Sequence, residues 1–113
     1  MSYDKGIAAR IRAHFADIDG VVEQQMMGAL CFMVQGHMCC GVTGDHLMIR
    51  VGFDGYADAL AEPHVVPLAM AGRTPRGFVL VSPKGVESEA DMTKWIARGR
   101  AFVRTLPLRA PKS

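Results

Sequence analysis

The sequence LCFMVQGHMCCGVTGDHLMIRV, residues 30–51, decides the fold that we expect for this chain. Three apolar runs occupy residues 30–34, 37–42 and 46–51. The short turns Gln35-Gly36 and Thr43-Gly44-Asp45 separate these runs. Each turn contains a glycine, which readily takes the positive φ that tight hairpin turns need. The stretch therefore predicts three antiparallel strands joined by two hairpins.

These turns also predict a register for the strands. A two-residue loop at Gln35-Gly36 would pair Val34 with His37, Met33 with Met38, Phe32 with Cys39, and Cys31 with Cys40. A loop at Gly44-Asp45 would pair Thr43 with His46 and Cys40 with Ile49. Because side chains alternate along a strand, one face would be entirely apolar and would form the core with the helices packed on it. It would consist of Cys31, Met33, Met38, Cys40, Val42, Leu47, Ile49 and Val51.

The opposite face is predicted to be mixed and to lie on the outside of the sheet. It would consist of Leu30, Phe32, Val34, His37, Cys39, Thr43, His46, Met48 and Arg50. An apolar patch within it, beside Arg50, is our predicted interaction surface: Leu30, Phe32, Val34 and Met48. A further segment or a protein partner could cover this patch, and a homodimer is one such arrangement.

The rest of the chain predicts three helices and further strands around this hairpin sheet. A helix capped by Asp4 carries an apolar stripe and ends at Gly20. Strands are expected at 21–27, 65–70 and 78–81, and a short helix at 54–60. Ser88 with Asp91 predicts the cap of a last helix, whose apolar stripe is Met92, Trp95, Ile96, Gly99, Phe102, Val103 and Leu106.

The chain is thus expected to be one α+β domain over residues 1–113, with an ordered core at about 4–107 and a loose C-terminal tail. The expected order is a helix, three or four strands, a helix, two strands and a helix. The 113 residues carry 13 basic and 11 acidic side chains, and this small excess does not by itself indicate nucleic-acid binding. The odd count of three cysteines, a charged N-terminus and the lack of an apolar run near ~20 residues indicate a cytoplasmic protein with no membrane segment.

The cysteines and histidines offer one candidate for a metal or thiol site. It would use Cys39, His37 and His46 on the outer face, although no tight pair such as C-x-x-C and no fourth ligand are evident. Cys39 and Cys40 are adjacent on a strand, so their side chains should point to opposite faces. We therefore favour buried thiols that act as small apolar side chains.

Arginines offer a second candidate site. A basic patch could form from Arg50, Arg73, Arg76, Arg98 and Arg104. Such a patch would suit an anion or a nucleic acid, whereas solvated arginines on a turn are the simpler interpretation.

Four segments, in this order, resemble the N-terminal domain of the TfoX/Sxy family. The segment Met26-Met27-Gly28-Ala29-Leu30 is similar to its glycine-containing opening, and residues 41–52, GVTGDHLMIRVG, are similar to its hairpin. Residues 72–79, GRTPRGFV, resemble its strand entry, and the segment from Trp95 to Pro107 resembles its closing helix. Met27 and Ala29 depart from the residues that the family often has, and we expect them to alter packing rather than fold.

This resemblance implies a secretion-chaperone-like fold and a regulatory role without catalysis. Full-length members regulate DNA-uptake competence, act at promoters with the cyclic-AMP receptor protein, and carry a second, helical domain at the C-terminus. This chain ends at Ser113, so we expect it to lack that domain. The first hypothesis is therefore a non-enzymatic regulatory or protein-interaction module with no cofactor, no catalytic residue and an unidentified protein partner. The second hypothesis is a nucleic-acid accessory protein that binds DNA directly and weakly through the arginines. The third is the metal or thiol site at the cysteine and histidines.

Overall fold

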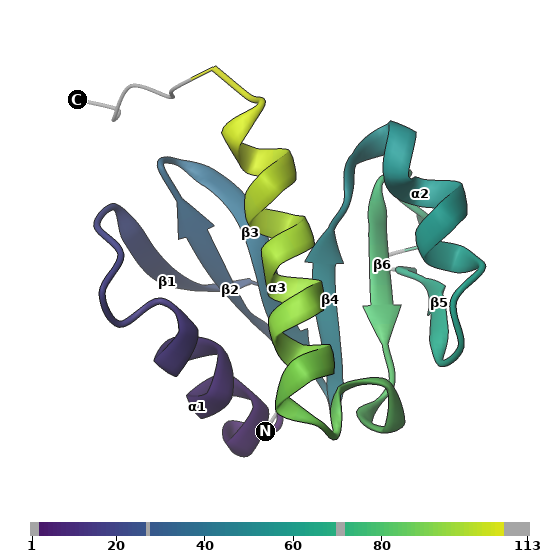
Figure 1. The fold of residues 1–113 in the computed structure, drawn as a ribbon, viewed down its shortest axis with the longest axis horizontal. Helices are drawn as coiled ribbons and strands as arrows, with labels where there is room; N and C mark the ends of the chain where they lie inside the picture. The colour runs from purple at the N-terminus through teal and green to yellow at the C-terminus, as the bar shows by residue number, and fades with distance from the viewer. Residues whose placement is uncertain (1–2, 27, 70–71, 108–113) are drawn as a thin grey trace.

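A computed structural model describes residues 3–26, 28–69 and 72–107, and shows six antiparallel strands in a single sheet with helices on one face (Figure 1). The sheet order is β1-β2-β3-β4-β6-β5. The elements are α1 Lys5–His14, β1 Val21–Met26, β2 Ala29–Val34, β3 His37–Thr43, β4 His46–Arg50, α2 Gly52–Leu60, β5 Val65–Pro67, β6 Phe78–Val81, the 3-10 helix η1 Pro83–Val86, and α3 Glu89–Arg104. The predicted α+β class and element order are confirmed.

Helix α1 begins as predicted and ends earlier. The Asp4 Oδ1 accepts a hydrogen bond from the backbone N–H of Ile7 at 3.0 Å, which satisfies one of the free donors of the first turn. The helix ends at His14 rather than near Gly20. Phe15, the residue after the helix, is still buried in the core. The predicted apolar stripe is therefore longer than the helix itself.

The two predicted hairpins are present, but their register differs at one point. Val34 pairs with His37, Met33 with Met38, Thr43 with His46, and Cys40 with Ile49, as expected. Beyond Met33 the register shifts, so Phe32 pairs with Cys40 and Cys31 pairs with Gly41. Cys39 is the extra residue of a β-bulge in β3. The predicted pairs Phe32–Cys39 and Cys31–Cys40 are therefore wrong.

The bulge reverses the predicted faces of β2. Cys40, Val42, Leu47 and Ile49 lie in the main core, as predicted. Across the bulge, however, their neighbours on β2 are Leu30, Phe32 and Val34, which also lie in the main core. Cys31 and Met33 lie on the helix-free face instead, where Met38 also lies. The β2 strand is apolar on both faces, so hydrophobicity alone did not fix which face is buried.

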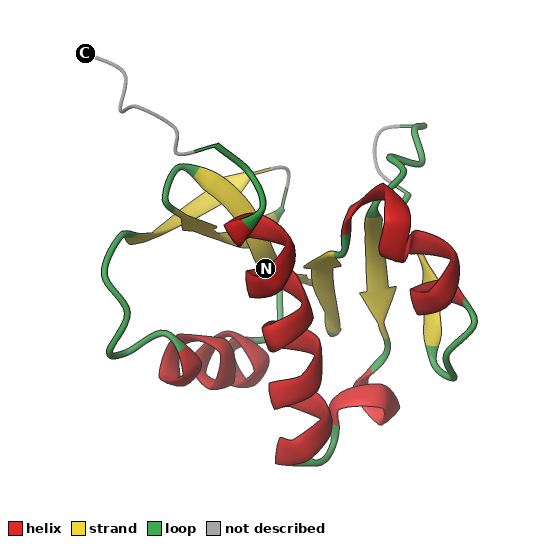
Figure 2. Cartoon of the chain, turned by 45° about the horizontal axis from the view of Figure 1, so that its top comes forward, coloured by secondary structure: helices red, strands yellow, loops and turns green. Residues whose placement is uncertain are grey.

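Helix α3 lies across the middle of the sheet, between α1 and α2 (Figure 2). Ser88 Oγ accepts a hydrogen bond from the Asp91 N–H at 3.1 Å, which confirms the predicted cap. The helix buries Met92, Trp95, Ile96, Gly99 and Val103 against the sheet. Gly99 allows the closest approach, because a Cβ built there would lie only 3.0 Å from the carbonyl oxygen of Cys39.

Of the remaining elements, β6 has the predicted bounds, β5 is shorter than predicted and α2 is longer. Strand β5 covers only three residues, and Pro67 is tolerated there because β5 is an edge of the sheet. Met27 and Met70, the predicted ends of two strands, lie outside the described residues. Helix α2 starts two residues before Asp54, at Gly52. Among the described residues, none of the helices combines the length and apolar character needed to cross a bilayer.

Candidate interaction groove

The apolar side chains of the predicted interaction surface are buried inside the domain. Leu30, Phe32 and Val34 are only 3%, 1% and 9% exposed. The ring of Phe32 stacks on the ring of Phe15 at a centroid distance of 5.9 Å, beside α1. The assignment of these three residues to the outside was wrong because the bulge shifts β2 by one residue relative to β3.

The helix-free face is apolar at its centre, with residues other than those predicted. Cys31 and Met48 are buried in it, and a Cβ on Gly41 would lie 3.0 Å from the Met48 methyl carbon. Half-buried side chains surround them: Met33, Met38, Phe78 and Leu80. Of the predicted patch, Met48 alone belongs to this centre.

The cysteine–histidine site is not assembled either. Cys39 and Cys40 share the main core and are both 0% exposed, because the bulge brings adjacent side chains to the same side of the sheet. The His37 Nε2 lies 2.6 Å from the Pro107 carbonyl oxygen, and the His46 Nδ1 lies 2.7 Å from Asp45 Oδ1. Within the described part of the chain, no group of three His, Cys, Asp or Glu side chains could hold a metal ion.

The two core thiols influence each other. The hydrogen bond between them lowers the pKa of Cys39, with a smaller contribution in the same direction from the charges of Arg100 and Arg50. The same hydrogen bond, together with burial, raises the pKa of Cys40 well above its ordinary value. Their burial favours the predicted role as small apolar side chains of the core.

The five arginines of the predicted basic patch lie in three separate parts of the structure. Arg50, Arg76 and Arg98 line one open groove between the start of α2 and the end of α3. Arg104 lines a second hollow, together with Arg100, beside the β2–β3 turn. Arg73 is exposed in the loop before β6 and does not line the groove. A continuous patch of all five arginines is therefore not formed.

A tight backbone junction shapes the floor of the groove. The N–H groups of Val51 and Gly52 both donate to the Gly77 carbonyl oxygen, at 2.7 and 3.1 Å. This pair of bonds joins the end of β4 to the start of β6 at the point where the chain enters α2. Gly52 has a φ of +82°, a left-handed conformation that glycine adopts with little strain.

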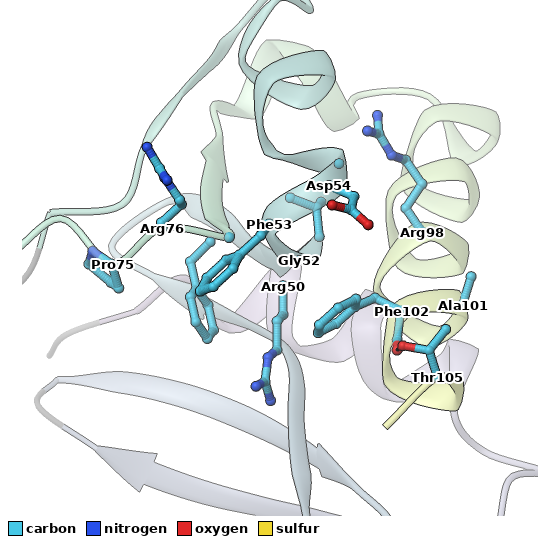
Figure 3. Close-up of a pocket in the computed structure, with 14 residues that line it drawn as sticks. Arg50, Gly52, Phe53, Asp54, Pro75, Arg76, Arg98, Ala101, Phe102 and Thr105 are labelled. Atoms are coloured by element: carbon cyan, nitrogen blue, oxygen red, sulfur yellow. Dashed lines mark hydrogen bonds between the residues drawn. The ribbon is translucent and has the colours of Figure 1, made fainter. Parts of the chain in front are cut away.

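Arg50 lies at this junction, between two aromatic rings. Its guanidinium carbon is 5.4 Å from the ring centroid of Phe78 and 5.4 Å from that of Phe102. Its Nη1 also donates to the Met38 carbonyl oxygen at 3.4 Å. Figure 3 shows the Arg50 side chain extending past Phe102. Both cation–π contacts hold the charge in place at the base of the groove.

Arg98 is held on the α3 side of the groove by neighbours of its own. Its Nη1 forms an ion pair with Glu62 at 2.7 Å, and its guanidinium lies over the Trp95 ring at 4.6 Å. Lys94 contacts the same two partners, with an Nζ–Glu62 distance of 2.8 Å. The hydrogen bond from Lys94, followed by the charges of Lys94 and Arg98, lowers the pKa of Glu62.

The mouth of the groove carries an exposed ring and an exposed cation. Phe53, in the first turn of α2, is 73% exposed, the highest value among the exposed large apolar side chains of the described residues. Arg76 is exposed and forms no ion pair within the described residues. Pro75 and Phe78 complete this side of the groove. Figure 3 shows the Arg76 side chain pointing away from the Phe53 ring and from Arg50.

The charged side chains that line the groove are three arginines and Asp54. Arginines remain protonated at neutral pH and cannot act as general bases. Asp54 is the carboxylate of the lining, and the Thr105 hydroxyl donates to the Phe102 carbonyl oxygen of its own helix at 2.6 Å. Sequence reasoning identified the three arginines and missed Phe53. The available signal was a large aromatic residue between Gly52 and Asp54, outside every predicted apolar stripe.

Comparison with known proteins gives one family match. A family model described as the TfoX N-terminal domain matches residues 13–103, which include the whole sheet and nearly all of α3. No curated protein and no solved structure matches the chain.

Proposed function

This chain belongs to the TfoX N-terminal domain family, and on that premise we propose that it is a non-enzymatic protein-interaction module whose contact surface is the groove between α2 and α3. A regulatory role agrees with the resemblance to the TfoX/Sxy competence regulators. Its three cysteines are free thiols, in keeping with a reducing, cytoplasmic location.

The observation that carries this proposal is the meeting of three phenylalanines and three arginines in one open groove. Phe53, Phe78 and Phe102 come from α2, β6 and α3, and the arginines come from β4, α3 and the turn before β6. Aromatic and arginine side chains are the residues most enriched at the centres of protein–protein interfaces. An exposed phenylalanine beside such a cluster supports contact with a protein.

Site-specific crosslinking in the native cell tests this proposal. A photoreactive phenylalanine analogue at position 53 should yield a discrete protein adduct. The same analogue at Val22, which is 60% exposed on β1, serves as the control for general stickiness. Arg76→Glu in the same chain should reduce the adduct at position 53.

Two results would overturn the proposal. One is an absence of protein adducts at position 53, or the same adducts from positions 53 and 22. The other is an adduct that nuclease removes and protease does not, which would favour the nucleic-acid alternative instead.

A further inference from the structure

The two edges of the sheet differ in their ability to accept another strand. One edge is β5, which has three residues and includes Pro67. The Leu68 N–H donates to the Phe78 carbonyl oxygen on β6, so alternation along β5 turns the nitrogen of Pro67 to the free edge. That nitrogen carries no hydrogen, and a short strand that lacks a donor is a poor template for another strand. The β5 edge is therefore protected.

The other edge, β1, presents a regular row of free backbone groups. It is six residues long and contains no proline (Figure 1). The Gln35 N–H donates to the Gly20 carbonyl oxygen at 3.0 Å, which fixes the alternation along β1. The backbone N–H and C=O groups of Val21, Glu23 and Gln25 consequently point to the free edge. Within the described residues, β1 is the last strand on this side of the sheet.

The one charged side chain of β1 does not protect its edge. Arg12 on α1 donates to both carboxylate oxygens of Glu23, from Nε at 2.6 Å and from Nη2 at 2.8 Å. This two-pronged ion pair offsets the charge of the carboxylate. Natural sheets guard their edges with charges, prolines or bulges. Because the register of β1 against β2 is regular and its carboxylate is paired, β1 has none of these protections.

The exposed side chains of β1 form a pattern that reads the same in both directions. Val22 lies opposite Met33, on the helix-free face of the sheet. Met26 lies on the same face, and Gln24 lies between Val22 and Met26. Val22 is 60% exposed and Met26 is 36% exposed, so two of the large apolar side chains left in water belong to this strand. The order apolar, polar, apolar matches a reversed copy of the same strand.

We infer that β1 pairs with β1 of a second copy of this chain, antiparallel and about a two-fold axis at Gln24. Residues directly opposite each other in such a pair point to the same face, so the helices of both copies lie on one side of a continuous sheet. Val22 of each copy then lies opposite Met26 of the other, and Glu23 lies opposite Gln25. An axis at Glu23 would instead place two carboxylates opposite each other, which destabilises a sheet.

This register uses the free backbone groups and covers the exposed apolar side chains together. Glu23 and Gln25 exchange backbone hydrogen bonds with their counterparts, and Val22 and Met26 occupy the pairs in which side chains lie closer. An unrelated strand would have to match this pattern, whereas a second copy matches it by symmetry. A single strand pair is a small interface, so we expect a Kd of about 100 µM.

The dimer is independent of the groove between α2 and α3, because no residue of β1 lines that groove. The photoreactive analogue at position 22 should therefore crosslink two copies of this chain. That adduct differs from the adduct expected at position 53.

Sedimentation equilibrium of the full chain, at loading concentrations from about 10 µM to about 1 mM, tests the dimer. The mass should rise from 12.3 kDa toward twice that value. A mass of 12.3 kDa over the whole range would overturn the inference. A mass that continues to rise past the dimer would overturn it as well, since a two-fold pair of edges is closed.

Two valines on the same face provide a matched pair of variants. Val22→Lys and Val66→Lys add the same charge at sites that are 60% and 48% exposed, on β1 and β5, so both variants should fold. Val22→Lys should raise the Kd of the dimer at least about tenfold, because a lysine on an edge strand opposes pairing. Val66→Lys should leave the Kd within about twofold. Equal effects of the two substitutions would overturn the inference.

Disulfide trapping tests the axis at Gln24. In the proposed pair the two Gln24 Cα atoms lie about 4.5 Å apart, within the range of a disulfide. Gln24→Cys should therefore give a covalent dimer under mild oxidation with copper phenanthroline, as seen on a non-reducing gel. Gln25→Cys is the control, because Gln25 is also exposed but lies opposite Glu23 of the second copy. The natural thiols are at most 2% exposed and should not contribute. Equal yields from the two variants, or a higher yield from Gln25→Cys, would overturn the proposed register.

Discussion

Gly52 lies directly against the ring of Phe102, so closely that a Cβ on Gly52 would overlap the ring carbons Cε1 and Cδ1. This contact brings the start of α2 onto the end of α3, and the same phenylalanine ring packs on Arg50. Gly52→Ala should therefore destabilise the fold by about 2–5 kcal/mol, from a left-handed φ and from overpacking together. Urea unfolding measures the loss.

Gly44→Ala is the matched control for this substitution. Gly44 also has a positive φ, +56°, but nothing lies within 4 Å of the position that its Cβ would take. Gly44→Ala should therefore lower the free energy of unfolding only by the cost of the left-handed backbone, about 1–2 kcal/mol. Equal losses for the two variants would show that Phe102 does not constrain Gly52.

Phe32 and Met33 are adjacent and lie on opposite faces of β2, so truncating each one tests the bulge. Phe32→Ala should cost about 3–5 kcal/mol, because it empties a fully buried site against Phe15. Met33→Ala should cost clearly less, because Met33 is half-buried on the helix-free face. Denaturant unfolding of both variants measures the difference. The reverse ranking would favour the simple, unbulged register.

Glu62 should make part of the stability dependent on pH. Its pKa is lowered in the folded chain by the hydrogen bond from Lys94 and by the charges of Lys94 and Arg98. A lowered carboxyl pKa stabilises the fold above the unfolded value, near 4.5, and this contribution is lost as the pH falls through the folded pKa. Glu62→Gln should cost at most about 1 kcal/mol at pH 7 and less than that at pH 3.

Urea titrations at pH 7 and pH 3 measure this change. Glu87→Gln is the control, because Glu87 is exposed and belongs to no ion pair of the described residues. A loss for Glu62→Gln that is the same at both pH values would contradict the ion-pair explanation.

The three thiols should react only when the chain unfolds. Cys39 has a lowered pKa, which by itself would favour attack by its thiolate, but its side chain is 0% exposed. Access therefore decides the rate. A coloured aromatic disulfide reagent should react with almost no thiol of the native chain. In urea it should react with three thiols per chain. One fast equivalent from the native chain would show that the core around Cys39 opens.

Most of the fold could be predicted from local signals. Asp4 and Ser88 cap helices where their side chains and spacing indicated, and the glycine turns placed both hairpins. The face of β2 could not be predicted, because Leu30, Phe32 and Val34 are apolar on one side and Cys31 and Met33 are apolar on the other. Alternation chooses a face only where the two sides differ. The bulge at Cys39 determines which face of β2 is buried, and no residue near it marks a bulge in the sequence.

The candidate groove was predictable in its charges and not in its assembly. Arg50, Arg76 and Arg98 were identified as one basic group, yet their meeting depends on the Gly52–Gly77 junction, a contact between residues far apart in the sequence. Phe102 was expected in the core stripe and is half-buried at the groove. Phe53 belonged to no periodic pattern, so its exposure could be found only in three dimensions.

The bulge at Cys39 also sets where the length of this chain can change. A residue gained or lost in the exposed turns at 35–36 or 44–45 would alter a loop and leave the strands on either side in phase. Removal of Cys39 would leave the pairs Phe32–Cys40 and Met33–Met38 in place and turn the bulge into a regular ladder, so the side chains of β2 would keep their faces. The hairpin therefore has one residue more than its ladder needs, and a chain one residue shorter at this point would keep the rest of the same core.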